Sequence, residues 1–234
     1  MRTSSKALDL VRMVKRNRDK SIEKGSEKGG HKGVKNFIPL IFLLFSVIII
    51  LGAGIYFLIA ENDDDGGSDI EVPDEGWITN YSPQERRGSS DEDWWTSQPN
   101  QNPSSGIIPE HPSWVIDKLR KGPVLILTHS EGCMPCITQQ EDIAKLLKVY
   151  GNEIQFIDLL SGSDQEASQT FDLYDPNGSP NYIPLSIVIT LIEDGNGDVR
   201  VAWHSAEGAT GSPWLTKYVK DAIYYHDKNI GDWV

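Results

Sequence analysis

The chain contains very little cysteine: among its 234 residues there are two, Cys133 and Cys136. A structural disulfide would more usually join distant parts of a chain, and a bridge between these two closes so short a loop that it restricts the unfolded state little. A structural zinc site needs three or four ligands, and the only histidine near the pair is His129. The scarcity of cysteine therefore disfavours both structural uses.

The two cysteines stand in the segment Cys133-Met134-Pro135-Cys136, directly after an apolar run and directly before a helical pattern. Two thiols three residues apart in the first turn of a helix can close a small disulfide. The outer thiol also lies against the unsatisfied N–H groups and the positive end of the helix dipole, which lower its pKa and favour the nucleophilic thiolate. The motif predicts thiol–disulfide exchange, and an inert buried pair is the remaining alternative.

Residues 37–60 contain no acid, base or amide side chain, and as a helix they would span about 36 Å, enough to cross a bilayer. Nothing in them marks an ion pathway, so they are interpreted as an anchor. Residues 1–36 hold 11 Lys or Arg against 4 Asp or Glu, a net +7, and residues 61–234 hold 11 against 30, a net −19. The positive flank stays in the cytoplasm, so the C-terminal part is expected to be extracytoplasmic. A cleaved signal peptide is the alternative, which the long apolar run and long leader disfavour.

Polar segments flank the predicted transmembrane helix, residues 37–60. The leader, residues 1–36, is expected to lie on anionic headgroups of the cytoplasmic face. Nucleic-acid binding is the alternative, but the leader has no aromatic stacking residue and no recognisable DNA-binding motif. Residues 61–106 are rich in Asp, Glu, Gly, Ser, Pro and Asn and are predicted to form an acidic flexible linker. Trp77, Trp94 and Trp95 are unusual there: they rest either on the membrane interface or on the domain, and the sequence leaves both open.

Residues 107–234 are long enough for one domain, and their pattern is that of an α/β fold. Apolar runs predict strands at 124–127, 154–160, 185–191 and 199–204. Helical spacing of the apolar residues up to Tyr150 indicates that the two cysteines open an amphipathic helix. Further helices are expected from Ser113, from the capping-box spacing at 163–166, and from Ser212 with Pro213 in the first helical position. The order is strand, helix, strand, helix, hairpin and closing helix.

Two motifs in this order resemble the thioredoxin family: C-x-P-C at the start of a helix, and Ile183-Pro184 at the start of the third strand. Gly208-Ala209 follows the hairpin, where thioredoxins also carry Gly-Ala. The resemblance implies a thioredoxin-like fold, a central mixed sheet flanked by helices, preceded here by a single transmembrane helix. It also implies a thiol–disulfide oxidoreductase without an organic cofactor, in which Cys133 attacks, Cys136 resolves the mixed disulfide, and Pro184, in cis, clamps the substrate backbone. An ordinary trans proline is the alternative for Pro184.

The sequence departs from this family at three positions. Gly132 stands where thioredoxins have Trp, Leu127 where they have a buried proton-accepting Asp, and Ile137 where they have a basic residue. A specialised exported relative is therefore favoured. Without that Asp another base has to deprotonate the resolving thiol, and Glu131 and His129 are the candidates by proximity in sequence.

The expected partners are thiols and disulfides of exported proteins, the membrane, and an electron donor in it, but no nucleic acid. Met-Pro between the cysteines resembles the Gly-Pro of the family's reductants, which favours the reductase or isomerase direction. The alternative is a non-catalytic binding module or a copper-handling protein, with Met134 and His129 as extra ligands. Residues 194–198 begin like a calcium loop but lack its Gly and Glu, so a hairpin turn is predicted there and no metal is expected.

Overall fold

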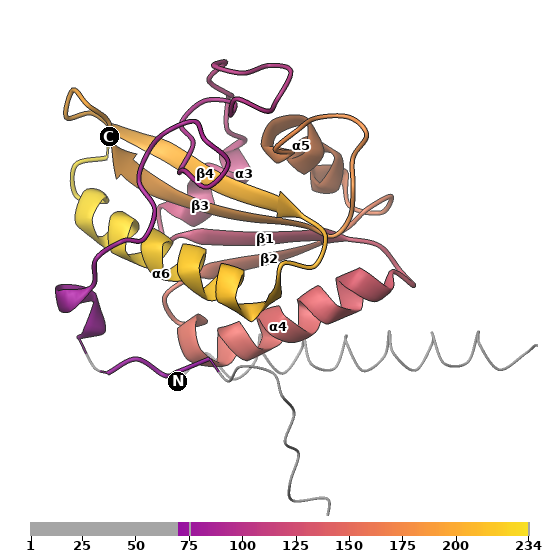
Figure 1. The fold of residues 1–234 in the computed structure, drawn as a ribbon, viewed down its shortest axis with the longest axis horizontal. Coiled ribbons are helices and arrows are strands. Elements are labelled where there is room, and N and C mark those ends of the chain that lie inside the picture. Colours follow the sequence, from indigo (N-terminus) through magenta and orange to yellow (C-terminus); the bar gives the residue numbers. More distant parts are fainter. Residues whose placement is uncertain (1–69, 75, 234) are drawn as a thin grey trace, which may run out of the picture. The chain divides into compact units, whose positions relative to one another are not determined.

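The computed structural model describes residues 70–74 and 76–233 (Figure 1). The predicted leader, residues 1–36, and the predicted transmembrane helix, residues 37–60, lie outside the described part. Within that part, no helix combines the length and the apolar character needed to cross a membrane.

The described domain is built on a four-stranded mixed sheet. The strands lie in the order β2, β1, β3, β4, with β1 parallel to β2 and β3 antiparallel to both β1 and β4. Their bounds are Val124–His129 for β1, Gln155–Leu160 for β2, Leu185–Glu193 for β3 and Val199–Glu207 for β4. All six residues of β1 are buried, as expected for a continuous apolar run in the middle of a sheet.

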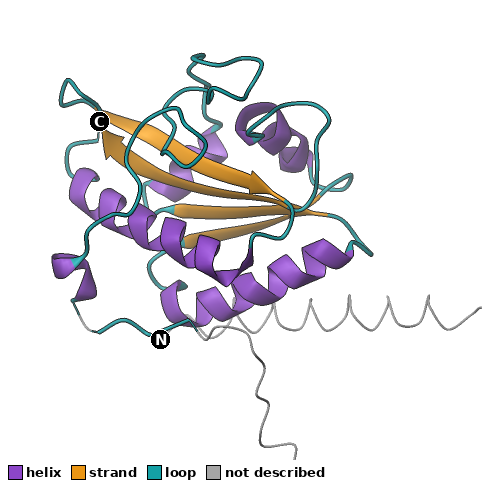
Figure 2. Cartoon of the chain, viewed as in Figure 1, coloured by secondary structure: helices purple, strands orange, loops and turns teal. Residues whose placement is uncertain are grey.

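Helices cover both faces of this sheet (Figures 1 and 2). One face carries α4 and α6, and Leu125 and Leu127 of β1 pack on that side; the other carries α3 and α5, and Val124 and Ile126 pack there. The bounds are Ser113–Leu119 for α3, Met134–Tyr150 for α4, Gln165–Tyr174 for α5 and Gly211–Asn229 for α6. The alternation of neighbouring strand residues between two cores confirms the predicted mixed sheet flanked by helices.

Element boundaries differ from the predicted ones by a few residues. Pro112 and Thr210, rather than Ser113 and Ser212, occupy the N-cap positions of α3 and α6, and neither helix has a side-chain cap. Strand β3 runs two residues and β4 three residues further than their apolar runs, because the strands stay paired from Glu193 opposite Val199 at the turn to Leu185 opposite Glu207 at the other end. Backbone pairing thus extends into polar sequence that hydrophobicity alone would exclude.

Residues 76–106 are not the flexible linker that their composition predicts. Trp94 and Trp95 are completely buried. The backbone N–H and C=O of Trp95 both bond to Trp203 of β4, at 2.9 Å each. Because β4 is the last strand of the sheet, this bridge covers part of an otherwise open edge. The composition argument failed because two adjacent tryptophans supply the buried apolar surface that the polar residues around them lack.

A buried carboxylate fastens the start of this segment to α6. Asp221 is fully buried and accepts hydrogen bonds from the hydroxyl of Tyr81 at 2.6 Å and from the backbone N–H groups of Gln84 and Glu85, both at 2.9 Å. Trp77, in the short 3-10 helix η1 (Trp77–Asn80), meets the ring of Tyr150 edge-on. The tryptophans therefore pack on the domain, which extends upstream of the predicted boundary at residue 107.

Candidate functional site: the dithiol edge

Three chain segments that carry the predicted site residues meet at one end of the strands, which is not the side edge formed by β4. Strands β1 and β2 end together, with His129 opposite Leu160, and β3 begins there, with Leu185 opposite Thr128. The loop to Cys133, the loop to α5 and the Ile183-Pro184 dipeptide consequently lie at the same edge. We call this region the dithiol edge.

The two cysteines form a disulfide at the first turn of α4, with their Cα atoms 5.2 Å apart. Cys133 is the N-cap of the helix, and its Sγ accepts a hydrogen bond from the backbone N–H of Cys136 at 3.2 Å. Cys133 is partly exposed, whereas Cys136 is only 1% exposed. The neighbouring Met134 is 61% exposed, a high value for an apolar side chain. An incoming protein would therefore reach Cys133 and not Cys136.

The peptide bond between Ile183 and Pro184 is cis, as the resemblance implies, and Pro184 is buried. Its carbonyl accepts a hydrogen bond of 2.7 Å from the backbone N–H of Gly208, which brings the Gly208-Ala209 turn beside it. Glu207 holds the preceding loop, because its carboxylate accepts from the amide of Asn177 and from the backbone N–H of Tyr182, at 3.0 Å each. The ring of Tyr182 remains 56% exposed at the dithiol edge.

A buried glutamine that sequence reasoning missed joins the helix of the cysteines to the other segments. Gln139 lies one turn beyond Cys136 and is fully buried. Its Nε2 donates to the hydroxyls of Ser186 and Thr210, at 2.9 Å each, and its Oε1 accepts from the backbone N–H of Thr210 at 2.8 Å. The side chain thus ties α4 to the start of β3 and to the turn after β4. A buried polar residue in an amphipathic helix gives no sequence signal that would reveal such a link.

The structure distinguishes the two candidate bases. Glu131 is exposed, whereas His129 is 4% exposed and its Nε2 lies 3.1 Å from Oδ1 of Asp158 in β2. The same nitrogen lies 3.4 Å from Nε2 of Gln140, which is one turn beyond Cys136 on the buried face of α4. Burial has the largest single effect and lowers the pKa of His129. The hydrogen bond and charge of Asp158, together with Ser130 and Asp164, outweigh it, so the pKa is raised from 6.5.

Asp158 was not among the predicted site residues. It lies directly opposite Leu127, the position at which thioredoxins carry their buried Asp, but on the neighbouring strand. The only signal in the sequence is a single acid within the apolar strand 154–160. That acid does not identify Asp158 as a site residue until the pairing of β1 with β2 is known.

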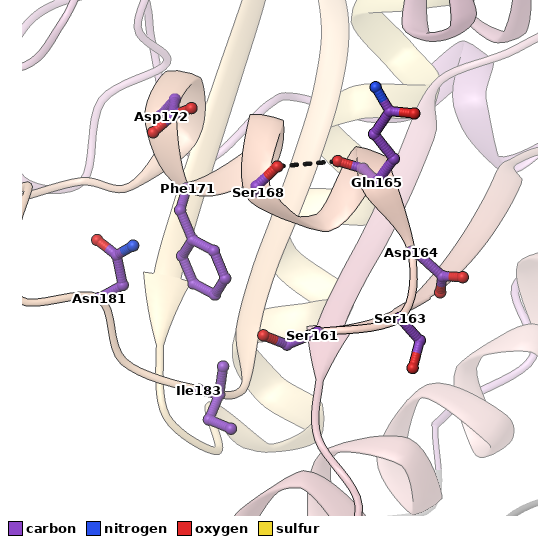
Figure 3. A pocket seen from close by; sticks show the side chains of 10 residues that line it. Ser161, Ser163, Asp164, Gln165, Ser168, Phe171, Asp172, Asn181 and Ile183 are labelled. Atoms are coloured by element: carbon purple, nitrogen blue, oxygen red, sulfur yellow. Dashed lines mark hydrogen bonds between the residues drawn. The ribbon is translucent and has the colours of Figure 1, made fainter.

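A hollow of about 590 Å³ adjoins the dithiol edge on the side of α5 (Figure 3). Figure 3 shows Phe171 pointing from α5 toward the segment that contains Asn181 and Ile183. The backbone N–H of Ser161, at one rim, bonds to the carbonyl of His129 at 2.7 Å. The lining side chains are mostly small and polar: Ser161, Ser163, Asp164, Gln165, Ser168, Phe171, Asp172, Asn181 and Ile183.

No metal centre is formed by the residues that the structure describes, because nowhere among them do three His, Cys, Asp or Glu come together. The suspected calcium loop is a hairpin turn between β3 and β4. In it Oδ1 of Asp194 accepts hydrogen bonds from the backbone N–H groups of Asn196, at 2.8 Å, and Asp198, at 3.1 Å.

Comparisons with known proteins find solved structures only at low similarity. Mitochondrial thioredoxin 3 from Saccharomyces cerevisiae is 15% identical, with a TM-score of 0.33, and covers 47% of this chain and 88% of its own. Trichomonas vaginalis thioredoxin is 15% identical, with a TM-score of 0.34 and coverages of 45% and 86%. A disulphide isomerase from Xylella fastidiosa Temecula1 is 15% identical, with a TM-score of 0.27 and coverages of 53% and 93%. No family model and no curated protein matches the chain.

Proposed function

We propose that this protein is a membrane-anchored thiol–disulfide oxidoreductase that exchanges disulfides with exported proteins. The observation that carries the proposal is the disulfide at the start of α4, with one accessible and one buried cysteine, at the same edge of the sheet as a cis proline. A disulfide that only stabilises the fold does not require its two sulfurs to differ in exposure. In an exchange site, one thiol must be accessible to the substrate, and the other is shielded and reacts only with the mixed disulfide.

In the reductase direction, the thiolate of Cys133 attacks one sulfur of a substrate disulfide. The substrate S–S bond breaks, one substrate sulfur leaves as a thiolate, and a mixed disulfide with Cys133 forms. The thiol of Cys136 then loses its proton and attacks Sγ of Cys133, which expels the second substrate thiolate and closes the Cys133–Cys136 disulfide. Two electrons have passed to the substrate, so a donor in the membrane must reduce the pair again. Pro184 would present its backbone edge to the substrate at this site.

We assign the proton from Cys136 to His129. The thiol is buried, so it requires a base beneath α4, and His129 lies beneath that helix in contact with Gln140. Asp158 would stabilise the imidazolium that forms. Glu131, the other candidate, is exposed on the loop before Cys133, whereas the Cys136 thiol that must be deprotonated is buried.

A trapping experiment tests this function. Cys136→Ser should accumulate mixed disulfides with partner proteins, because the intermediate forms but cannot be resolved, whereas Cys133→Ser should accumulate none. The measurement is a non-reducing gel of membranes after acid quenching, with the trapped partners identified by mass spectrometry. Equal trapping by both variants would refute the assigned roles, and no trapping by either would favour the non-catalytic binding module.

The proposed anchor and orientation have their own test. With residues 37–60 in the membrane and the basic leader in the cytoplasm, a protease added to intact cells or spheroplasts should digest residues 61–234 and spare residues 1–36. Antibodies against each part, used on blots before and after detergent lysis, would follow both fragments. Digestion of the leader with protection of the domain would contradict the orientation.

A further inference from the structure

We infer that the hollow beside the dithiol edge binds the substrate chain and selects segments that carry Lys or Arg next to the cysteine to be exchanged. This inference rests on the proposed function and adds a substrate class to it. The hollow is next to the cis proline, because Ile183 is both one of its lining residues and the residue that precedes Pro184. A chain whose sulfur reached Cys133 would thus pass the mouth of the hollow.

The chemistry of the lining favours a cationic and polar occupant. The residues around this open volume of about 590 Å³, large enough for one or two side chains, include two carboxylates, those of Asp164 and Asp172, and five serine or amide side chains. The Asp164 carboxylate also accepts a hydrogen bond from the backbone N–H of Leu160. The side chains that the structure places in this lining include no Lys or Arg. Hydroxyl, amide and carboxylate oxygens together accept the several N–H groups of an ammonium or guanidinium.

The surroundings carry the same sign of charge over a longer stretch. Residues 161–183, which supply every residue that lines the hollow, contain four Asp or Glu and no Lys or Arg. The N-terminus of α5 opposes this effect, since its free N–H groups attract anions. Its cap residue and its first turn already carry acids, Asp164 and Glu166, which offset the helix dipole. The net field at the mouth therefore attracts cations.

Two exposed apolar side chains complete the surface. Met134, between the cysteines, and Tyr182, two residues before the cis proline, are 61% and 56% exposed. Both lie at the dithiol edge, so a substrate segment can rest its apolar residues on them while a basic side chain enters the hollow. The expected substrates are extended, unfolded segments with mixed apolar and basic sequence, rather than acidic ones.

The test uses the reduced full-length protein and two peptides of the same length, each with one cysteine joined by a disulfide to a coloured thiol. One peptide has Lys and the other Glu at the positions flanking the cysteine. We expect the second-order rate of reaction with Cys133 to be about tenfold higher for the Lys peptide at low salt, and the ratio to fall toward one at ~1 M salt, where the Debye length is only about 3 Å.

Single-residue variants test whether the hollow causes the preference for the Lys peptide. Asp172→Asn should reduce the preference and Ser168→Lys, on the exposed side of α5, should abolish or reverse it. Asp198→Asn is the matched control, because Asp198 is an exposed acid in the hairpin at the opposite end of β3, and it should leave the preference unchanged. The small coloured disulfide without a peptide reports the proposed function alone. If it reacts but both peptides react equally, the substrate inference is wrong and the proposed function stands; if it does not react, the proposed function itself fails.

Discussion

Replacing Trp95 by Ala in the full-length chain should lower the free energy of unfolding by about 3–5 kcal/mol. The side chain is completely buried, its indole N–H donates to the carbonyl of Ser90 at 2.8 Å, and its ring packs against Trp203 and His204. Truncation to Ala would leave a cavity next to the edge strand and remove one of the two hydrogen bonds that the carbonyl of Ser90 accepts. A loss of this size is a large part of the 5–15 kcal/mol that stabilises a typical domain.

Urea unfolding followed by circular dichroism measures this loss. With a slope of about 2 kcal/mol per molar urea, the midpoint should fall by about 2 M. Ile108→Ala is the control from a neighbouring position, since Ile108 is 73% exposed and its truncation should cost less than about 0.5 kcal/mol. Equal midpoints for the two variants would show that residues 76–106 unfold separately from the sheet. If the prediction holds, a chain that starts at the predicted boundary, residue 107, should be too unstable to purify as a folded domain.

Replacing His129 by Gln should slow the resolution of the mixed disulfide about 100-fold at neutral pH, within the range that a positioned base contributes. The measurement is the rate at which Cys136 releases a coloured thiol from a disulfide preformed with Cys133. The rate of that preforming step should not change, because it does not require the proton of Cys136. Equal slowing of both steps would indicate a general structural defect and contradict the assigned role.

The pH profile separates a base from a structural residue. In the unmodified protein the resolution rate should fall as the pH drops through the raised pKa of His129, because the protonated imidazole cannot accept another proton. Asp158→Asn removes the carboxylate that raises this pKa while the burial that lowers it remains, so the inflection should move to lower pH. In His129→Gln the inflection should vanish. An unchanged profile in Asp158→Asn would show that another group accepts the proton.

The sequence alone determined the features that depend on neighbours in the chain. The buried strand β1 follows from an unbroken apolar run, and the helix of the cysteines from apolar spacing of 3.6 residues after a proline in its first turn. The cis peptide before Pro184 was implied by a motif resemblance and is present. These features are local or nearly so, and the pairing of β3 with β4 follows from the short turn at 194–198 between them.

Only the tertiary structure decided which distant residues meet. Asp158 becomes the partner of His129 through the parallel register of β1 and β2, and Gln139 joins three segments up to 71 residues apart. Composition failed for residues 76–106, because it averages over a segment, whereas burial depends on where Trp94 and Trp95 find an uncovered strand edge and a second core. The hollow likewise arises between α5, with the loop before it, and the loop before β3, which are separate in the sequence. Such contacts depend on the docking of complete strands and helices, so a pattern read over a few neighbouring residues cannot contain them.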